Sequence, residues 1–189
     1  MVDPNEMLDT LKDVARRLND LGIGYMVTGS VAMSVYATAR TTMDIDVIVQ
    51  IAPSNADKFA RGFEDGYYVD VESIRRAQRH QSMFNILNYN TGVKVDCIIR
   101  KSNDFEAAKF SRRRRSTIGD IEFWVISKED LILSKLDWAK DSHSERQFND
   151  VRNLIESGAD EELIHRSIER QRLQDVWKAF KEWKTRIEK

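Results

Sequence analysis

Residues 45–49, which read Ile-Asp-Val-Ile-Val, form a β-prone apolar segment that the carboxylate of Asp46 interrupts, and a second carboxylate, Asp44, comes just before it. In a strand, residues i and i+2 point to the same face, so Asp44 and Asp46 share one face while Ile45 and Val47 point to the core. Two like charges on one face repel each other. A divalent cation that prefers hard oxygen ligands, Mg²⁺ or Mn²⁺, is the usual means of offsetting that repulsion. The segment therefore predicts a strand that carries a metal site near its start.

A second apolar segment, residues 93–99, carries the lone acid Asp96. The turn residues Asn90-Thr91-Gly92 before it predict a hairpin with a strand over residues 84–89. If the strand with Asp96 lies beside the first one, three carboxylates converge. Two-metal phosphoryl transfer needs such a cluster, with the ions roughly 3.5–4 Å apart. Asp96 is also placed to take the proton from an incoming hydroxyl group.

Gly29 and Ser30 lie between a predicted strand, residues 23–28, and a short predicted helix, residues 31–37. A glycine at such a junction lets the backbone approach a phosphate closely, and the helix N-terminus and the Ser30 hydroxyl donate to it. The chain thus offers a phosphate-binding turn, a metal site and a candidate base, in that order.

The remaining patterns define the fold class. A capped helix is predicted to begin after Asp3, a helix over residues 53–65, a strand over residues 121–126, and a helix capped by Ser127; residues 69–82 give no firm assignment. Strands dominate residues 23–126, and helices dominate residues 127–189. We therefore predict an α/β (α+β) fold, with a mixed sheet flanked by helices in a domain at 1–126 and a helical region at 127–189 packed on it.

Composition limits the classes of function. The 189 residues carry a formal net charge of −1, which excludes a polycation that binds nucleic acid by charge alone. The single cysteine, Cys97, has no intramolecular partner and favours a reducing compartment. We see no signal peptide and no apolar run near the roughly 20 residues of a membrane span. These features predict a cytoplasmic protein with no membrane partner.

The pattern Gly29-Ser30, Asp44-Ile45-Asp46 and a later Asp96 resembles the signature of the nucleotidyltransferase superfamily, which has a DNA polymerase β-like fold. The resemblance implies a nucleoside triphosphate as substrate. It also implies that Gly29 and Ser30 bind the phosphates, that Asp44 and Asp46 hold Mg²⁺ or Mn²⁺, and that Asp96 serves as metal ligand or base.

Two further segments resemble the AbiEii group of abortive-infection toxins, a minimal bacterial type within that superfamily. Residues 40–46 are similar to its R-x-T-x-D-h-D motif, and residues 127–136, followed by Arg146 and Asp150, are similar to a later helical segment. The resemblance implies that Lys135 and Asp150 face the nucleotide and that a cognate partner protein of a toxin–antitoxin pair is possible. Arg40 either neutralises triphosphate charge or pairs with Asp44.

These features predict a metal-dependent nucleotidyltransferase that moves a nucleoside monophosphate to a hydroxyl of tRNA, of a protein or of a small molecule. Two other classes stay open: a nucleotide-binding regulatory or toxin–antitoxin module without turnover, and a structural helical interaction domain. Each residue also has a structural interpretation. Asp44 and Asp46 could be surface acids on an edge strand, and Asp96 could pair with Lys94 or an arginine. Gly29-Ser30 could be an ordinary turn, and Arg112–Arg115 could be a solvated loop rather than a phosphate-binding segment. On the later helices, Lys135 could extend to solvent and Asp150 could be a solvated residue.

Overall fold

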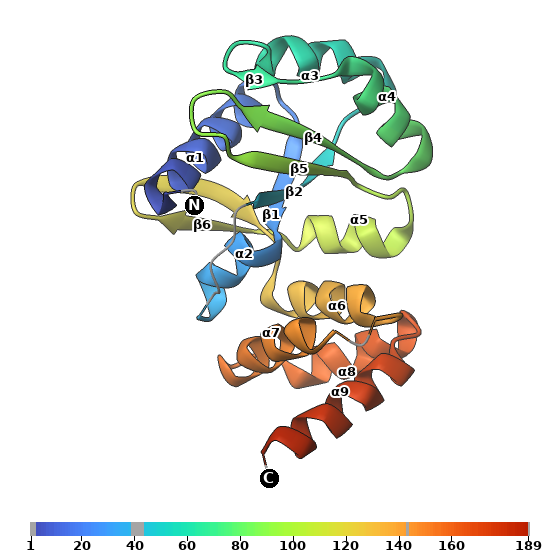
Figure 1. Cartoon of the computed structure of the whole chain (residues 1–189). Coiled ribbons are helices and arrows are strands. Elements are labelled where there is room, and N and C mark those ends of the chain that lie inside the picture. Colours follow the sequence, from blue (N-terminus) through green and yellow to red (C-terminus); the bar gives the residue numbers. More distant parts are fainter. Residues whose placement is uncertain (1–2, 39–43, 143, 189) are drawn as a thin grey trace. The chain divides into compact units, whose positions relative to one another are not determined.

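The computed structural model describes residues 3–38, 44–142 and 144–188, and Figure 1 shows the course of the chain. The chain divides into two compact units. The first comprises Met1–Ala32 and Arg40–Ile126, and the second comprises Met33–Ala39 and Ser127–Lys189.

The described part of the first unit contains a seven-stranded mixed sheet in the order β3-β4-β5-β2-β1-β7-β6. The β2–β5 and β1–β7 pairs are parallel and the other neighbouring pairs are antiparallel. This mixed sheet confirms the predicted fold class. The strands are β1 (Gly24–Thr28), β2 (Asp44–Gln50), β3 (Tyr67–Tyr68), β4 (Met83–Asn88), β5 (Lys94–Ile99), β6 (Arg114–Ile118) and β7 (Ile121–Val125).

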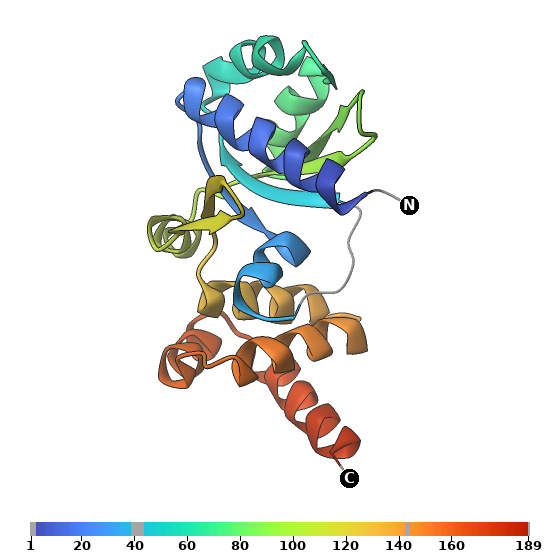
Figure 2. The ribbon, with the colours of Figure 1, turned by 90° about the vertical axis from the view of Figure 1, so that its left-hand side faces the viewer.

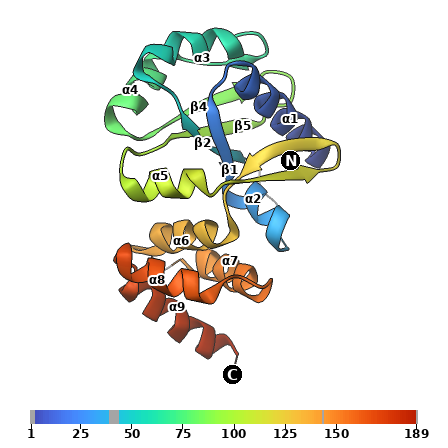
Figure 3. The same cartoon turned by 180° about the vertical axis from the view of Figure 1, so that it is seen from behind.

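The helices of this unit are α1 (Pro4–Asp20), the start of α2 (Gly29–Tyr36), the short η1 (Pro53–Asn55), α3 (Ala56–Phe63), α4 (Val71–His80) and α5 (Asp104–Ser111). The expected capping box is present, since the Asp3 side chain accepts from Asn5 N and Glu6 accepts from Asp3 N. Figures 2 and 3 show α1 lying along β2 and the β6–β7 hairpin.

Strand β4 shows which face of the sheet is covered. Phe84 and Ile86 are buried and alternate with the exposed Met83, Asn85 and Leu87. The Phe59 ring of α3 meets the Phe84 ring edge-on, with centroids 5.2 Å apart, and α4 packs on the same strand. Because strand residues alternate between faces, Asn85 points to the face opposite these helices.

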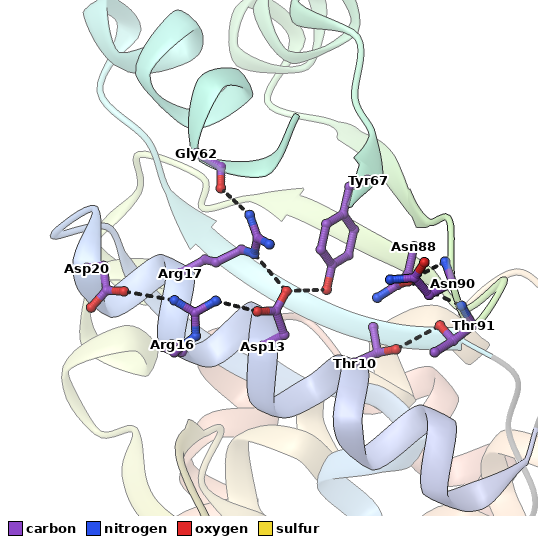
Figure 4. A network of polar contacts seen from close by, with 10 residues as sticks. All are labelled: Thr10, Asp13, Arg16, Arg17, Asp20, Gly62, Tyr67, Asn88, Asn90 and Thr91. Carbon is purple, nitrogen blue, oxygen red and sulfur yellow. Dashed lines mark hydrogen bonds and ion pairs between the residues drawn. The ribbon is translucent and has the colours of Figure 1, made fainter. Parts of the chain in front are cut away.

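A polar network ties α1 to the far edge of the sheet (Figure 4). Asp13 accepts hydrogen bonds from Arg16, Arg17 and the Tyr67 hydroxyl of β3. Burial opposes the charge of Asp13, but these three hydrogen bonds outweigh it and hold the pKa of this carboxyl below its usual value. Arg17 also donates to the carbonyl of Gly62 at 2.8 Å, which links α1 to α3.

The second unit is helical and contains the end of α2, α6 (Lys128–Ala139), α7 (Glu145–Glu156), α8 (Glu161–Arg170) and α9 (Gln174–Ile187). Ser127 caps α6 as predicted, because its side chain accepts from the backbone of Asp130 at 3.3 Å. Phe148 of α7 packs against Phe180 and Trp183 of α9. None of the helices in the described ranges has both the length and the apolar character that a membrane crossing requires.

Three features differ from the expectations or add to them. Residues 69–82, left unassigned, contain α4. Helix α5 and strand β6 were not predicted. The solvated loop considered for Arg112–Arg115 is confirmed in its exposure, since Arg112, Arg114 and Arg115 are exposed, but Arg114 and Arg115 belong to strand β6 rather than to a loop. Within this run, the Arg113 guanidinium lies 4.3 Å from the Phe110 ring centroid and 4.6 Å from that of Trp124, and it donates to the Phe110 carbonyl at 2.8 Å.

Candidate functional site

The two acid-bearing strands are neighbours. Strands β2 and β5 are parallel, and Asp46 is directly opposite Asp96 in their register. Strand β2 lies between β5 and β1, so the alternative that Asp44 and Asp46 are acids of an edge strand is wrong. Paired residues share a face, and Asn85 of β4 is opposite Asp96. The acids therefore lie on the sheet face opposite α3 and α4.

The Gly29 turn adjoins this pair of acids. Thr28, the last residue of β1, is opposite Asp46, and Gly29 then begins α2 with a φ of +62°. A Cβ atom on Gly29 would lie only 2.7 Å from Asp46 Cγ. A side chain has no room here, and the bare backbone at the start of α2 lies against the carboxylate. The buried Ser30 follows directly. The predicted turn and the predicted acids thus meet at one place.

Lys94 places a positive charge among the acids. Its Nζ lies 3.1 Å from Asp96 Oδ2 and 3.5 Å from Asp44 Oδ2. Partial burial opposes this charge, but the hydrogen bond to Asp96 and the charges of Asp96 and Asp44 outweigh it, so the pKa of Lys94 is raised. The expected alternative of an Asp96–Lys94 pair is confirmed, and Lys94 reaches Asp44 as well.

Asn85 was not identified from the sequence. With its amide nitrogen facing Asp96, it donates to Asp96 Oδ1 at 2.9 Å. Asn85 is also among the residues that line a hollow of about 420 Å³, together with Tyr68, Arg76 and Met83. The alternation of β4 carried the signal, since a polar residue between Phe84 and Ile86 must lie on the opposite face. Asp96 is thus held by Lys94 on one oxygen and by Asn85 on the other.

The donor set suits a hard cation, although no three of the described acidic side chains are gathered around one point. Carboxylates are the ligands that Mg²⁺ and Mn²⁺ prefer, and the Lys94 ammonium demonstrates that Asp44 and Asp96 present oxygens to one positive centre. Across residues 3–38, 44–142 and 144–188, no group of three His, Cys, Asp or Glu side chains is arranged to hold a metal ion. The carboxylates are thus suitable ligands for the metal, and their side chains would have to move for three of them to bind one ion.

Lys135 and Asp150 come together within the second unit. Lys135 Nζ lies 2.5 Å from Asp150 Oδ2, and the two side chains are only 1% and 3% exposed. The Gln147 side chain accepts from the same ammonium at 3.5 Å. The alternatives of a lysine extended to solvent and of a solvated acid are therefore wrong. Their role at a nucleotide stays a prediction, and Arg40 lies outside the described residues.

Comparison with known proteins yields a fold rather than a family. No sequence-family model matches the chain, and no curated protein matches it either.

Solved structures are similar in fold. The lincosamide antibiotic adenylyltransferase LnuA, with lincomycin bound, is 18% identical with a TM-score of 0.52, over 81% of this chain and 96% of LnuA. ANT(2″)-Ia, in complex with adenylyl-2″-tobramycin, is 14% identical with a TM-score of 0.55, over 95% and 98% of the two chains. A putative nucleotidyltransferase from Thermotoga maritima is 17% identical with a TM-score of 0.54, over 77% and 92%. The chain thus has a nucleotidyltransferase-like fold.

Gly29→Ala tests the close approach of the turn to Asp46. A left-handed φ costs a non-glycine residue about 1–2 kcal/mol, and the new Cβ would in addition displace the Asp46 carboxylate. We expect this variant to melt at a lower temperature and, if the turn binds phosphate as the sequence predicts, to lose most of its affinity for nucleotide. The measurement is a thermal melt with and without ATP.

Gly119→Ala is the matched control. Gly119 has the same φ of +62° but no atom within 4 Å of an added Cβ. It should show only the destabilisation that a left-handed φ causes in a non-glycine residue, and ATP should change its melting temperature as it does in the natural chain. Equal behaviour of the two variants would contradict the close approach at Gly29.

Proposed function

We propose that the protein is a metal-dependent nucleotidyltransferase that moves a nucleoside monophosphate from a nucleoside triphosphate to an acceptor hydroxyl and releases pyrophosphate. The observation that carries the proposal is the meeting of three separate sequence elements. Asp46 and Asp96 are opposite one another on parallel strands, and Gly29 begins a helix against Asp46. The nucleotidyltransferase-like fold supports it.

Each group has a defined part in the proposed reaction. The backbone of Gly29 and the N-terminal turn of α2 bind phosphate, because the backbone N–H groups and the dipole of a helix N-terminus favour an anion. Mg²⁺ or Mn²⁺ on Asp44, Asp46 and Asp96 would supply charge neutralisation to the attacking and leaving oxygens.

The bond changes balance without a further reactant. The bond from the acceptor oxygen to the α-phosphorus forms as the bond from that phosphorus to the pyrophosphate oxygen breaks. Asp96 takes the hydroxyl proton. The chain's own contribution is positioning and electrostatic stabilisation.

The acceptor is proposed at the level of its class. The names of two similar structures include lincomycin and tobramycin, which favours a small-molecule hydroxyl as the first acceptor to test. A tRNA end and a protein hydroxyl are the other candidates. An AbiEii-type subgroup with a cognate partner protein is proposed only on the segments at residues 40–46 and 127–150.

A transfer assay tests the proposal. The protein is incubated with each α-labelled nucleoside triphosphate, Mg²⁺ or Mn²⁺, and separate pools of aminoglycosides and lincosamides, tRNA and total protein. The control is the double variant Asp44→Ala/Asp46→Ala. Label that appears in one pool and is lost in the double variant would establish transfer and identify the acceptor class. Absence of label and of pyrophosphate with every pool, beside a clear nucleotide-induced rise in melting temperature, would instead support a binding module without turnover.

A further inference from the structure

The position of Lys94 among the acids affects how a metal ion and a nucleotide would bind at the site. Lys94 and Asp96 are two residues apart on β5, so their side chains share one face of the sheet. Asp44 is directly opposite Lys94 on β2. The register of two strands therefore fixes the ammonium between two carboxylates.

The ammonium contacts the oxygens that a divalent cation would need. Lys94 Nζ is 3.1 Å from Asp96 Oδ2 and 3.5 Å from Asp44 Oδ2. A lysine ammonium is a compact point charge on a flexible four-carbon stem, and the Lys94 side chain is 39% exposed. It is therefore able to leave these carboxylates when another anion is offered.

We propose that Lys94 is a built-in competitor of the divalent cation at Asp44 and Asp96, and that the phosphates of a nucleoside triphosphate are the anion that draws it away. Metal and Lys94 cannot both hold the same oxygens, since two positive charges at that spacing repel each other. Metal alone binds weakly because it must displace the ammonium. With a triphosphate present, the displaced ammonium gains a new partner, so nucleotide and metal bind together. The proposal rests on the proposed function for the role of the acids.

The test is a titration of the whole, nucleotide-free protein with Mn²⁺, followed by calorimetry. Lys94→Met removes the charge and keeps the length of the side chain. We expect it to bind Mn²⁺ about tenfold more tightly than the natural chain, since a partly exposed like charge is removed from the site. Lys94→Arg keeps a positive charge and should bind Mn²⁺ as weakly as the natural chain.

A second measurement, the affinity for ATP without metal, should change in the opposite direction to the affinity for Mn²⁺. In buffer with EDTA, Lys94→Met should bind ATP more weakly than the natural chain, because the phosphates lose their cationic partner. Tighter metal binding together with weaker metal-free nucleotide binding is not expected of a residue with a purely structural role.

Lys12→Met is the matched control, since Lys12 forms an exposed ion pair with Asp120 away from the acids. It should change neither titration. The proposal is overturned if Lys94→Met binds Mn²⁺ no more tightly than the natural chain, including the case in which neither binds it. A failed transfer assay with the Lys94→Met effect intact would instead reject the proposed reaction and keep the competition between Lys94 and metal.

Discussion

Asp46→Asn is expected to lower the rate of the proposed nucleotide transfer by about a thousandfold or more. A metal-bound carboxylate contributes several kcal/mol to stabilisation of the transition state, and each 1.36 kcal/mol corresponds to about a factor of ten in rate. Asparagine keeps the size of the side chain, so the contact with Gly29 survives. The rate is measured as release of pyrophosphate under saturating nucleotide and acceptor.

The melting temperature separates this effect from unfolding. Removing one of three neighbouring carboxylates relieves repulsion, so Asp46→Asn should melt at the same temperature as the natural chain or a higher one. An Asp20→Asn variant, in an exposed ion pair with Arg16 on α1, should leave the rate unchanged. Full activity of Asp46→Asn would contradict the proposed site.

Lys135→Met is expected to cause the largest loss of stability. It leaves the Asp150 carboxylate in a site where both side chains are at most 3% exposed. Removing one partner of a buried ion pair typically costs about 3–5 kcal/mol, which corresponds to roughly 6–20 °C in melting temperature for a chain of this length. Thermal and urea unfolding measure it.

The double variant Lys135→Met/Asp150→Leu should recover most of that loss, because the buried carboxylate that has lost the Lys135 ammonium is then removed as well. Lys178→Met, from an exposed pair with Glu182, should change the free energy of unfolding by less than about 0.5 kcal/mol. If the double variant is no more stable than Lys135→Met, the cost comes from packing rather than from the loss of the buried ion pair.

The sequence predicted the elements that have a strong local signal. Asp44 and Asp46 alternate with apolar residues, and the turn at Asn90-Thr91-Gly92 marks a hairpin, so both features follow from neighbours in the chain. The pairing of the strands that carry Asp46 and Asp96 could only be stated as a condition, because strand order depends on packing between distant segments. The structure satisfies that condition.

The parts that were missed have weak or misleading local signals. Helix α4 buries only Ile74 and Ala77, so its apolar stripe is too thin to stand out among its charged residues. Strand β6 begins inside a run of arginines, which looks like a solvated segment. The contacts that hold β6 in the sheet, such as Arg115 opposite Trp124 of β7, are formed only in the folded chain. Asn85 was missed because its importance depends on the strand beside it.

The reactivity of the Cys97 thiol depends on the register of β5 and therefore reports on whether the site is correctly folded. It follows Asp96 directly and is opposite Phe84 on the covered face of the sheet. Burial raises the pKa of its thiol and so suppresses its reactivity. A slip of β5 by one residue exchanges the two faces, which would remove Asp96 from Asp46 and bring the thiol to the open side. Slow reaction of Cys97 with a thiol reagent is therefore expected of molecules in which β5 has the register that places Asp96 opposite Asp46.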